Sequence, residues 1–202
     1  MESGEFVLVG ATPVAFRFQI MARLTGSLLL EVRFDEGRML VLDYVRNTYF
    51  LGPNSAENRQ RLFALDMTPR EFLMALTGRV PEAEFAQAGG EWIGPRQARM
   101  GGEAAHYRFW LDAHGLPSRW VKRRHGRELF RVEYRDYLSL SDAAGPPLRL
   151  PRKLRIYSGG EEPLLVLGVR EFQPGLAARE AMNFDPPSGG DWRFEPLPGP
   201  AN

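Results

Sequence analysis

The stretch TPREFLMALTG, residues 68–78, carries the clearest helix signals of the chain. Thr68 and Glu71 have the spacing of a capping box, in which each side chain accepts a hydrogen bond from the other residue's backbone N–H. Pro69 occupies the first helical position, where its fixed backbone angle favours a helix. Gly78 suits the left-handed conformation with which many helices end. These signals predict a helix that begins after Thr68 and ends at Gly78.

This helix is the centre of a helical block over residues 54–86. Asn54 and Ser55 are candidate N-caps of a preceding helix, since their side chains can accept a hydrogen bond from its first turn. A third helix is expected over residues 81–88. The block separates two long regions in which hydrophobic and polar residues alternate.

The alternation outside the block has the period of two that is typical of half-buried β-strands. It predicts strands over 14–24, 28–34, 39–45 and 49–51 before the block. After it, strands are expected over 104–111, 119–124, 127–136, 150–157 and 163–172, with an edge strand near residues 192–194. His125-Gly126 suits a tight hairpin turn. No βα alternation occurs, so a parallel α/β fold is not expected.

This order predicts an α+β fold that is mainly β. We expect one large, curved, antiparallel sheet with two or three helices plugging its concave face. Residues 1–202 would form a single domain, with an irregular, proline- and glycine-rich tail over 186–202.

The concave face has two interpretations, because the walls of a pocket and a packed core use the same residue types. Either the helices fill the sheet as an ordinary core, or they leave a cavity for an apolar ligand. In the second case the cavity would be lined by Phe16, Phe18, Ile20, Leu28, Leu30, Leu42, Phe72, Leu73, Leu76, Phe109 and Trp120.

The composition limits the possible chemistry. The formal net charge is +1, which argues against bulk DNA as a partner, and the chain has no cysteine. The histidines His106, His114 and His125 lack the spacing of metal ligands, and the sequence has no nucleophile elbow, phosphate loop or dinucleotide fingerprint. Glu133 and Asp136 are explained by a charge-balanced strand. We therefore predict a protein that is not an enzyme and has neither metal nor cofactor.

A basic stretch over residues 119–135 is the strongest charge feature. Three interpretations remain open: a solvated hairpin, contact with anionic lipid headgroups or a partner, and a stacking platform for single-stranded nucleic acid. Its members are Arg119, Lys122, Arg123, Arg124, Arg127, Arg131 and Arg135, interleaved with Trp120, Phe130 and Tyr134.

Three segments resemble proteins of the LolA/LolB superfamily, LolB in particular. FRVEYRDY at 130–137 is followed by LPRKLRI at 150–156, and LMALTGRVP at 73–81 is similar to a helix that ends in a Leu-x-Gly-x-Pro turn. The order of strands, helical block and strands is also similar over about residues 15–175.

The resemblance implies an incomplete barrel whose helices cover a hydrophobic cavity. It implies a monomeric, non-enzymatic carrier of acyl chains of lipoproteins or other lipids, in the periplasm or anchored to the outer membrane facing the periplasm. The family's LolB is anchored through a lipidated N-terminal cysteine, which the sequence given does not contain. The rival expectation is a protein- or nucleic-acid-interaction module that uses the basic hairpin 119–135.

Overall fold

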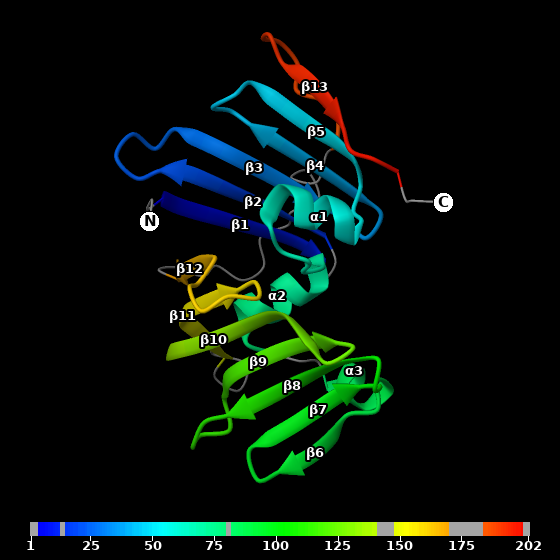
Figure 1. Cartoon of the computed structure of the whole chain (residues 1–202). Helices are drawn as coiled ribbons and strands as arrows, with labels where there is room; N and C mark the ends of the chain where they lie inside the picture. Colours follow the sequence, from blue (N-terminus) through cyan, green and yellow to red (C-terminus); the bar gives the residue numbers. More distant parts are fainter. Residues whose placement is uncertain (1–3, 13–14, 80–81, 141–147, 170–183, 200–202) are drawn as a thin grey trace. The chain divides into compact units, whose positions relative to one another are not determined.

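The computed structural model describes residues 4–12, 15–79, 82–140, 148–169 and 184–199. The chain divides into two compact units. The first comprises Met1–Phe63, Thr68–Arg70 and Gln173–Asn202, and the second comprises Ala64–Met67 and Glu71–Phe172. Each unit is built on its own β-sheet (Figure 1).

The first sheet is six-stranded, in the order β1-β2-β3-β4-β5-β13. Strands β1 to β5 are antiparallel neighbours, drawn in blue to cyan in Figure 1, whereas β13 runs parallel to β5. The strands are β1 (Gly4–Thr12), β2 (Ala15–Ala22), β3 (Leu28–Phe34), β4 (Arg38–Asp43), β5 (Thr48–Pro53) and β13 (Arg193–Pro196).

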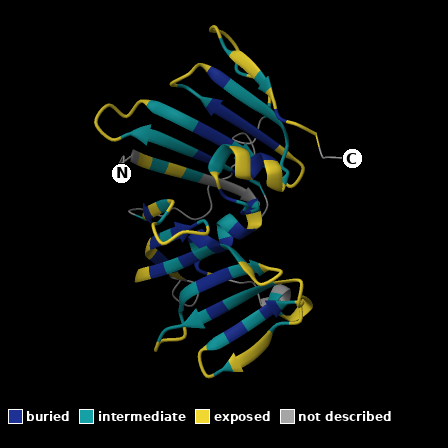
Figure 2. Cartoon of the chain, viewed as in Figure 1, coloured by how far each residue is buried: buried dark blue, intermediate teal, exposed yellow. Residues whose placement is uncertain are grey.

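One face of the first sheet carries the apolar core of this unit. Helix α1 (Ala56–Phe63) supplies Leu62 and Phe63 to a cluster with Val32, Met39 and Val41. The strand residues are buried because alternate positions of neighbouring strands face the same side, and Figure 2 shows the resulting alternation along β2. Burial of these side chains is the main stabilising term of the unit.

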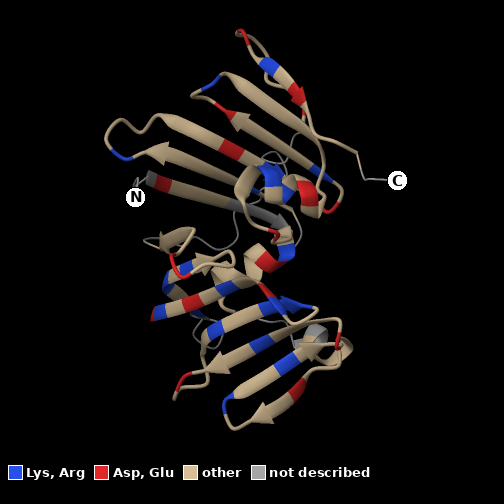
Figure 3. Ribbon diagram, in the orientation of Figure 1, with Lys and Arg blue, Asp and Glu red and all other residues tan. Residues whose placement is uncertain are grey.

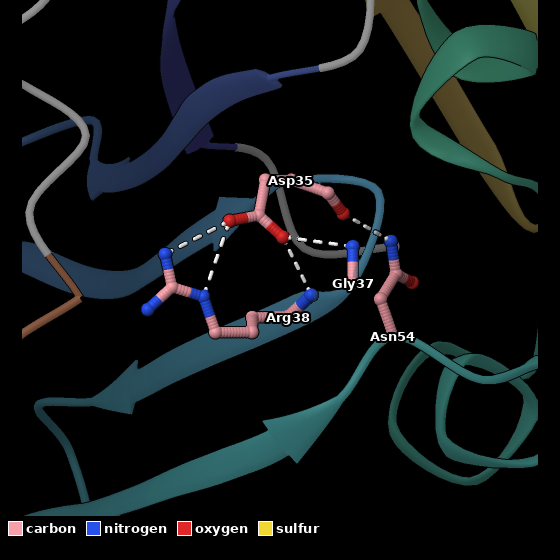
Figure 4. Close-up of polar contacts among 4 residues, drawn as sticks. All are labelled: Asp35, Gly37, Arg38 and Asn54. Carbon is pink, nitrogen blue, oxygen red and sulfur yellow. Dashed lines mark hydrogen bonds and ion pairs between the residues drawn. The ribbon is translucent and has the colours of Figure 1, made fainter.

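The turn between β3 and β4 is fixed by Asp35 (Figure 4). Its Oδ1 accepts hydrogen bonds from the backbone N–H groups of Gly37 at 2.8 Å and Arg38 at 2.6 Å. Its backbone carbonyl accepts a bond from Nδ2 of Asn54 at 2.8 Å. The turn therefore holds the end of β5 and the start of α1 in place.

The second sheet is seven-stranded and antiparallel, in the order β12-β11-β10-β9-β8-β7-β6. Helices α2 (Pro69–Thr77) and α3 (Glu82–Gln87) precede it in the chain. Its strands, yellow to green in Figure 1, are β6 (Glu91–Gly94), β7 (Gln97–Gly101), β8 (Ala105–Leu111), β9 (Pro117–Arg124), β10 (Arg127–Leu140), β11 (Leu148–Tyr157) and β12 (Leu165–Gly168).

The structure confirms a mainly β fold with three helices among the described residues. Gly78 ends α2 with a φ of 61°, and His125-Gly126 forms the β9–β10 turn with positive φ at both residues.

The prediction of one large sheet is wrong, because the described strands form two sheets, neither of which closes into a barrel. Alternation identifies strands but not which edges pair, so β1 and β12 could not be recognised as ends of separate sheets. The grouping of both units into one domain stays a prediction.

The pattern also missed three strands and the direction of a fourth. Strand β1 was not predicted because its apolar residues are adjacent rather than alternating, and strands β6 and β7 were not predicted because they are only four and five residues long. Strand β13 matches the expected edge strand near residues 192–194, but its parallel pairing with β5 was not foreseen.

No helix in the described part of the chain is long and apolar enough to cross a membrane.

Glu31 on β3 is a buried carboxylate on the face of the first sheet opposite the core cluster. Only 1% of the residue is exposed. It accepts hydrogen bonds from Nη2 of Arg17 at 2.7 Å, Nε2 of Gln19 at 2.7 Å and Nε of Arg33 at 2.6 Å. Because Arg17 and Arg33 are paired directly across β2 and β3, the carboxylate also separates two like charges.

Replacement of Glu31 by alanine is expected to lower the free energy of unfolding by about 3 kcal/mol, because two guanidinium groups lose their shared counter-ion. Urea unfolding measures the change. The matched control is Glu36→Ala in the exposed β3–β4 turn, where we expect a change within about 0.5 kcal/mol. Equal stability of the two variants would contradict the assignment.

Candidate functional site

An aromatic layer covers the inner face of the second sheet, which we define as the face toward α2. Trp120 on β9 is 2% exposed and stacks on Phe109 with ring centroids 5.9 Å apart and an interplanar angle of 14°. It meets Phe130 edge-on at 5.1 Å and lies 5.8 Å from Tyr107. Direct pairing of β8 with β9 and of β9 with β10 brings these rings onto one face. Such packing gives a rigid apolar surface.

The polar atoms of this layer are satisfied and uncharged. The indole N–H of Trp120 donates to the hydroxyl of Tyr134 at 2.8 Å. Burial, followed by the nearby Tyr137, raises the pKa of Tyr134 well above its usual value. Burial, followed by Asp112, likewise raises the pKa of Tyr137, whose hydroxyl donates to the carbonyl of Pro117. Both shifts disfavour the charged phenolate, as expected of an apolar environment.

A buried ion pair joins α2 to this apolar face. The Oε1 atom of Glu71 lies 2.6 Å from Nζ of Lys122 and accepts a hydrogen bond of 2.6 Å from the hydroxyl of Tyr107. The side chains of Glu71 and Lys122 are 4% and 17% exposed. Glu71 lies in the first turn of α2, where the partial positive charge of the helix N-terminus favours a carboxylate. These contacts fix the start of α2 over β8 and β9.

A small cavity lies between the end of α2 and the aromatic layer. Its free volume is about 10 Å³, which is room for about one water molecule. Gly78 belongs to this lining, and a Cβ there would lie 2.9 Å from Cγ of Pro151, so the close approach requires glycine. The lining consists of Met74, Gly78, Arg79, Phe109, Pro117, Trp120 and Tyr134.

The structure distributes the predicted cavity residues over both units. Phe109 and Trp120 lie in the second unit, stacked on the inner face, and Leu76 is buried there on α2. Phe72 and Leu73 are half-buried on the same helix. Phe16, Phe18, Ile20, Leu28 and Leu30 lie in the first unit on β2 and β3. A single cavity lined by both groups stays a prediction.

Leu42 does not share a face with the phenylalanines of β2. It is paired with Glu31 and Tyr49, whereas Phe18 is aligned through Val32 with Val41. The structure therefore places Leu42 on the other face of the first sheet from Phe16 and Phe18, with which the sequence pattern had grouped it. The reason is register, because a shift of one residue in pairing moves a side chain to the other side of the sheet.

Several residues of the site were not predicted as such. Glu71 was interpreted only as a capping residue, and Lys122 only as part of a basic stretch. The sequence carries a signal that could have placed Lys122, since it is two residues from Trp120 and the two side chains share a face of β9. Met74 and Tyr134 gave no sequence signal beyond being apolar or aromatic within an element.

The basic stretch also divides between the two faces. Lys122 lies on the inner face, whereas Arg119, Arg123 and Arg131 lie on the opposite one. The rings that were predicted to interleave with them are on the inner face and are buried, so they cannot form a platform for stacked bases. Trp120, Phe130 and Tyr134 are 2%, 0% and 7% exposed.

No group of three or more His, Asp or Glu residues in the described ranges is placed to hold a metal ion. No protein-family model matches the chain, and a search of curated proteins found no significant similarity.

The ion pair at the start of α2 is expected to be strongly coupled. Glu71→Leu alone or Lys122→Met alone should lower the free energy of unfolding by about 3 kcal/mol, because each leaves a buried charge without its partner. The double variant should cost less than the two single variants together by at least about 1 kcal/mol. Urea unfolding of the four proteins measures this coupling, and strictly additive effects would contradict it.

Proposed function

We propose that the protein is a non-enzymatic carrier that binds an acyl chain of a lipoprotein or another lipid against the aromatic layer, with α2 as a movable cover. The observation that carries the proposal is the junction of α2 with the layer. It contains a small cavity lined mainly by apolar side chains and is held at one end by the buried ion pair of Glu71 and Lys122.

The cavity holds about one water molecule, so a chain enters only when α2 moves away. Burying a chain of about 16 carbons is worth roughly 12 kcal/mol before the cost of association. Displacing α2 exposes Met74, at about 1.5–3 kcal/mol, and parts the Glu71–Lys122 pair, whose two charges regain water when they separate. The acyl chain covers the surface that α2 leaves. The free energy gained by burying the chain, after the cost of association, is therefore of the same order as the free energy lost by displacing the helix. Such an exchange permits both uptake and release.

The resemblance to the LolA/LolB superfamily supports the same proposal. The proposed carrier would arrange its strands as an incomplete barrel and would act in the periplasm or at the outer membrane facing it. It would be a monomer and would receive the acyl chain as part of a lipoprotein. The order of the elements, strands followed by α1, α2 and α3 and then further strands, is consistent with it.

Intrinsic fluorescence offers a test at residue level. Of the four tryptophans, only Trp120 lies in the aromatic layer; Trp92 is 65% exposed, Trp110 lies on the opposite face of the sheet, and Trp192 belongs to the first unit. Bromine atoms quench an indole ring that they contact. A stearate brominated at the middle of its chain should therefore quench the wild-type protein saturably.

The quenching should disappear in Trp120→Phe and persist in the matched variant Trp110→Phe. Displacement of a fluorescent fatty acid, measured in parallel, reports whether each variant still binds. Quenching that persists without Trp120 would place the chain elsewhere. Absence of saturable binding by either probe would refute the carrier.

A further inference from the structure

The face of the second sheet opposite α2, which we call the arginine face, carries a dense group of basic side chains. Figure 3 shows Lys and Arg positions on each of the neighbouring strands β7, β8, β9 and β10. Arg99 is paired directly with Arg108, and His106 is paired directly with Arg123. The register assigns to this face Arg99, His106, Arg108, Arg119, Arg123, Arg131 and Arg155.

Only part of this charge is neutralised by the protein. Arg131 is bonded to Glu128 and Glu133, each at 3.3 Å, and Arg99 lies 3.8 Å from Glu91. On this face, four further arginines among the described residues have no carboxylate within 4.0 Å and no side-chain hydrogen bond. They are Arg108, Arg119, Arg123 and Arg155, and all four are half-buried.

The arginine face also has buried polar atoms without hydrogen-bond partners among the described residues. The Nε atoms of Arg99, Arg108 and Arg119 are buried and find no hydrogen-bond partner in the described structure, and the same holds for Nδ1 of His106. Desolvation, followed by Arg99, Arg108 and Arg123, lowers the pKa of His106. The charges of these three arginines thus add to the effect of desolvation in disfavouring the protonated imidazole.

The aromatic rings of this face are already occupied. The guanidinium of Arg119 lies 4.9 Å from the ring centroid of Trp110, with that of Arg108 at 5.9 Å. Arg131 lies 4.1 Å above the ring of Tyr157. Stacking on these rings holds the guanidinium groups in place. It also means that bases of a nucleic acid do not find free rings on which to stack.

We propose that the arginine face docks the protein onto a membrane surface rich in anionic phospholipids, whose phosphate groups bind Arg108, Arg119 and Arg123. Guanidinium groups match phosphate because they donate two parallel hydrogen bonds to it. Strands about 4.8 Å apart spread these groups in two dimensions, which fits a headgroup layer rather than a single strand of nucleic acid. The proposal is independent of the carrier function, since it uses the other face of the sheet.

The test is co-sedimentation with vesicles at low and at physiological salt. The wild-type protein should bind vesicles of phosphatidylglycerol mixed with phosphatidylcholine, bind vesicles of phosphatidylcholine alone far more weakly, and lose affinity as salt rises. Each arginine near an anionic surface adds about a factor of five in partitioning. Combined replacement of Arg108, Arg119 and Arg123 by glutamine should therefore reduce binding about a hundredfold.

The matched control removes the same charge from the first unit, by replacing the exposed Arg23, Arg46 and Arg61 with glutamine. It should bind within a few-fold of the wild type, and urea unfolding confirms that both variants are folded. An NMR titration gives a second readout: the pKa of His106 should rise when a soluble short-chain phosphatidylglycerol neutralises its arginine neighbours.

Three results would overturn the proposal. The glutamine variant of the arginine face could bind as well as the wild type, or the control variant could lose binding equally, which would show an effect of net charge alone. Tighter binding to a single-stranded oligonucleotide than to anionic vesicles at the same salt would assign the face to nucleic acid.

Discussion

The contact between Glu71 and Lys122 is the interaction on which the arrangement of the second unit depends. It places two opposite charges in an otherwise apolar layer, where desolvation makes each costly unless the other is present. The hydroxyl of Tyr107 and the N-terminus of α2 both favour the carboxylate. Hydrophobic burial is non-directional, whereas this hydrogen-bonded pair is satisfied in only one position. The ion pair therefore specifies where α2 lies.

The same strands build two surfaces of opposite character. On β9 the side chains of Trp120 and Lys122 face α2, while Arg119 and Arg123 face away from it. The period of two makes this separation automatic, so one sheet has an apolar aromatic face and a basic face. If the two proposals hold, the acyl chain and the anionic headgroups would bind on opposite sides of this sheet.

Local order could be predicted from the sequence because its signals are local. The start of α2 at Pro69, its end at Gly78 and the turn at His125-Gly126 depend on neighbours within a few positions. The existence of two sheets depends instead on which edges pair over long distances, and alternation carries no information about that. Leu42 shows the same limitation at the level of one residue, because its face follows from the register with Glu31.

The candidate site was predictable only in its apolar part. Phe109, Trp120 and Leu76 were expected to be inward because large apolar side chains leave water. The pairing of Glu71 with Lys122 joins residues 51 positions apart, and charged residues are ordinarily assigned to the surface. Only the spacing of these two residues from apolar neighbours in the sequence indicates that they are buried.

Hydrogen exchange of the backbone amides of α2 tests most directly whether this helix is a cover or a part of the core. If α2 is a cover, the amides of residues 72–77 exchange through local opening, with a free energy well below that of global unfolding. Glu71→Gln then lowers this opening free energy more than it lowers global stability. If these amides exchange only through global unfolding, in the wild type and the variant alike, α2 is part of the core and does not act as a cover.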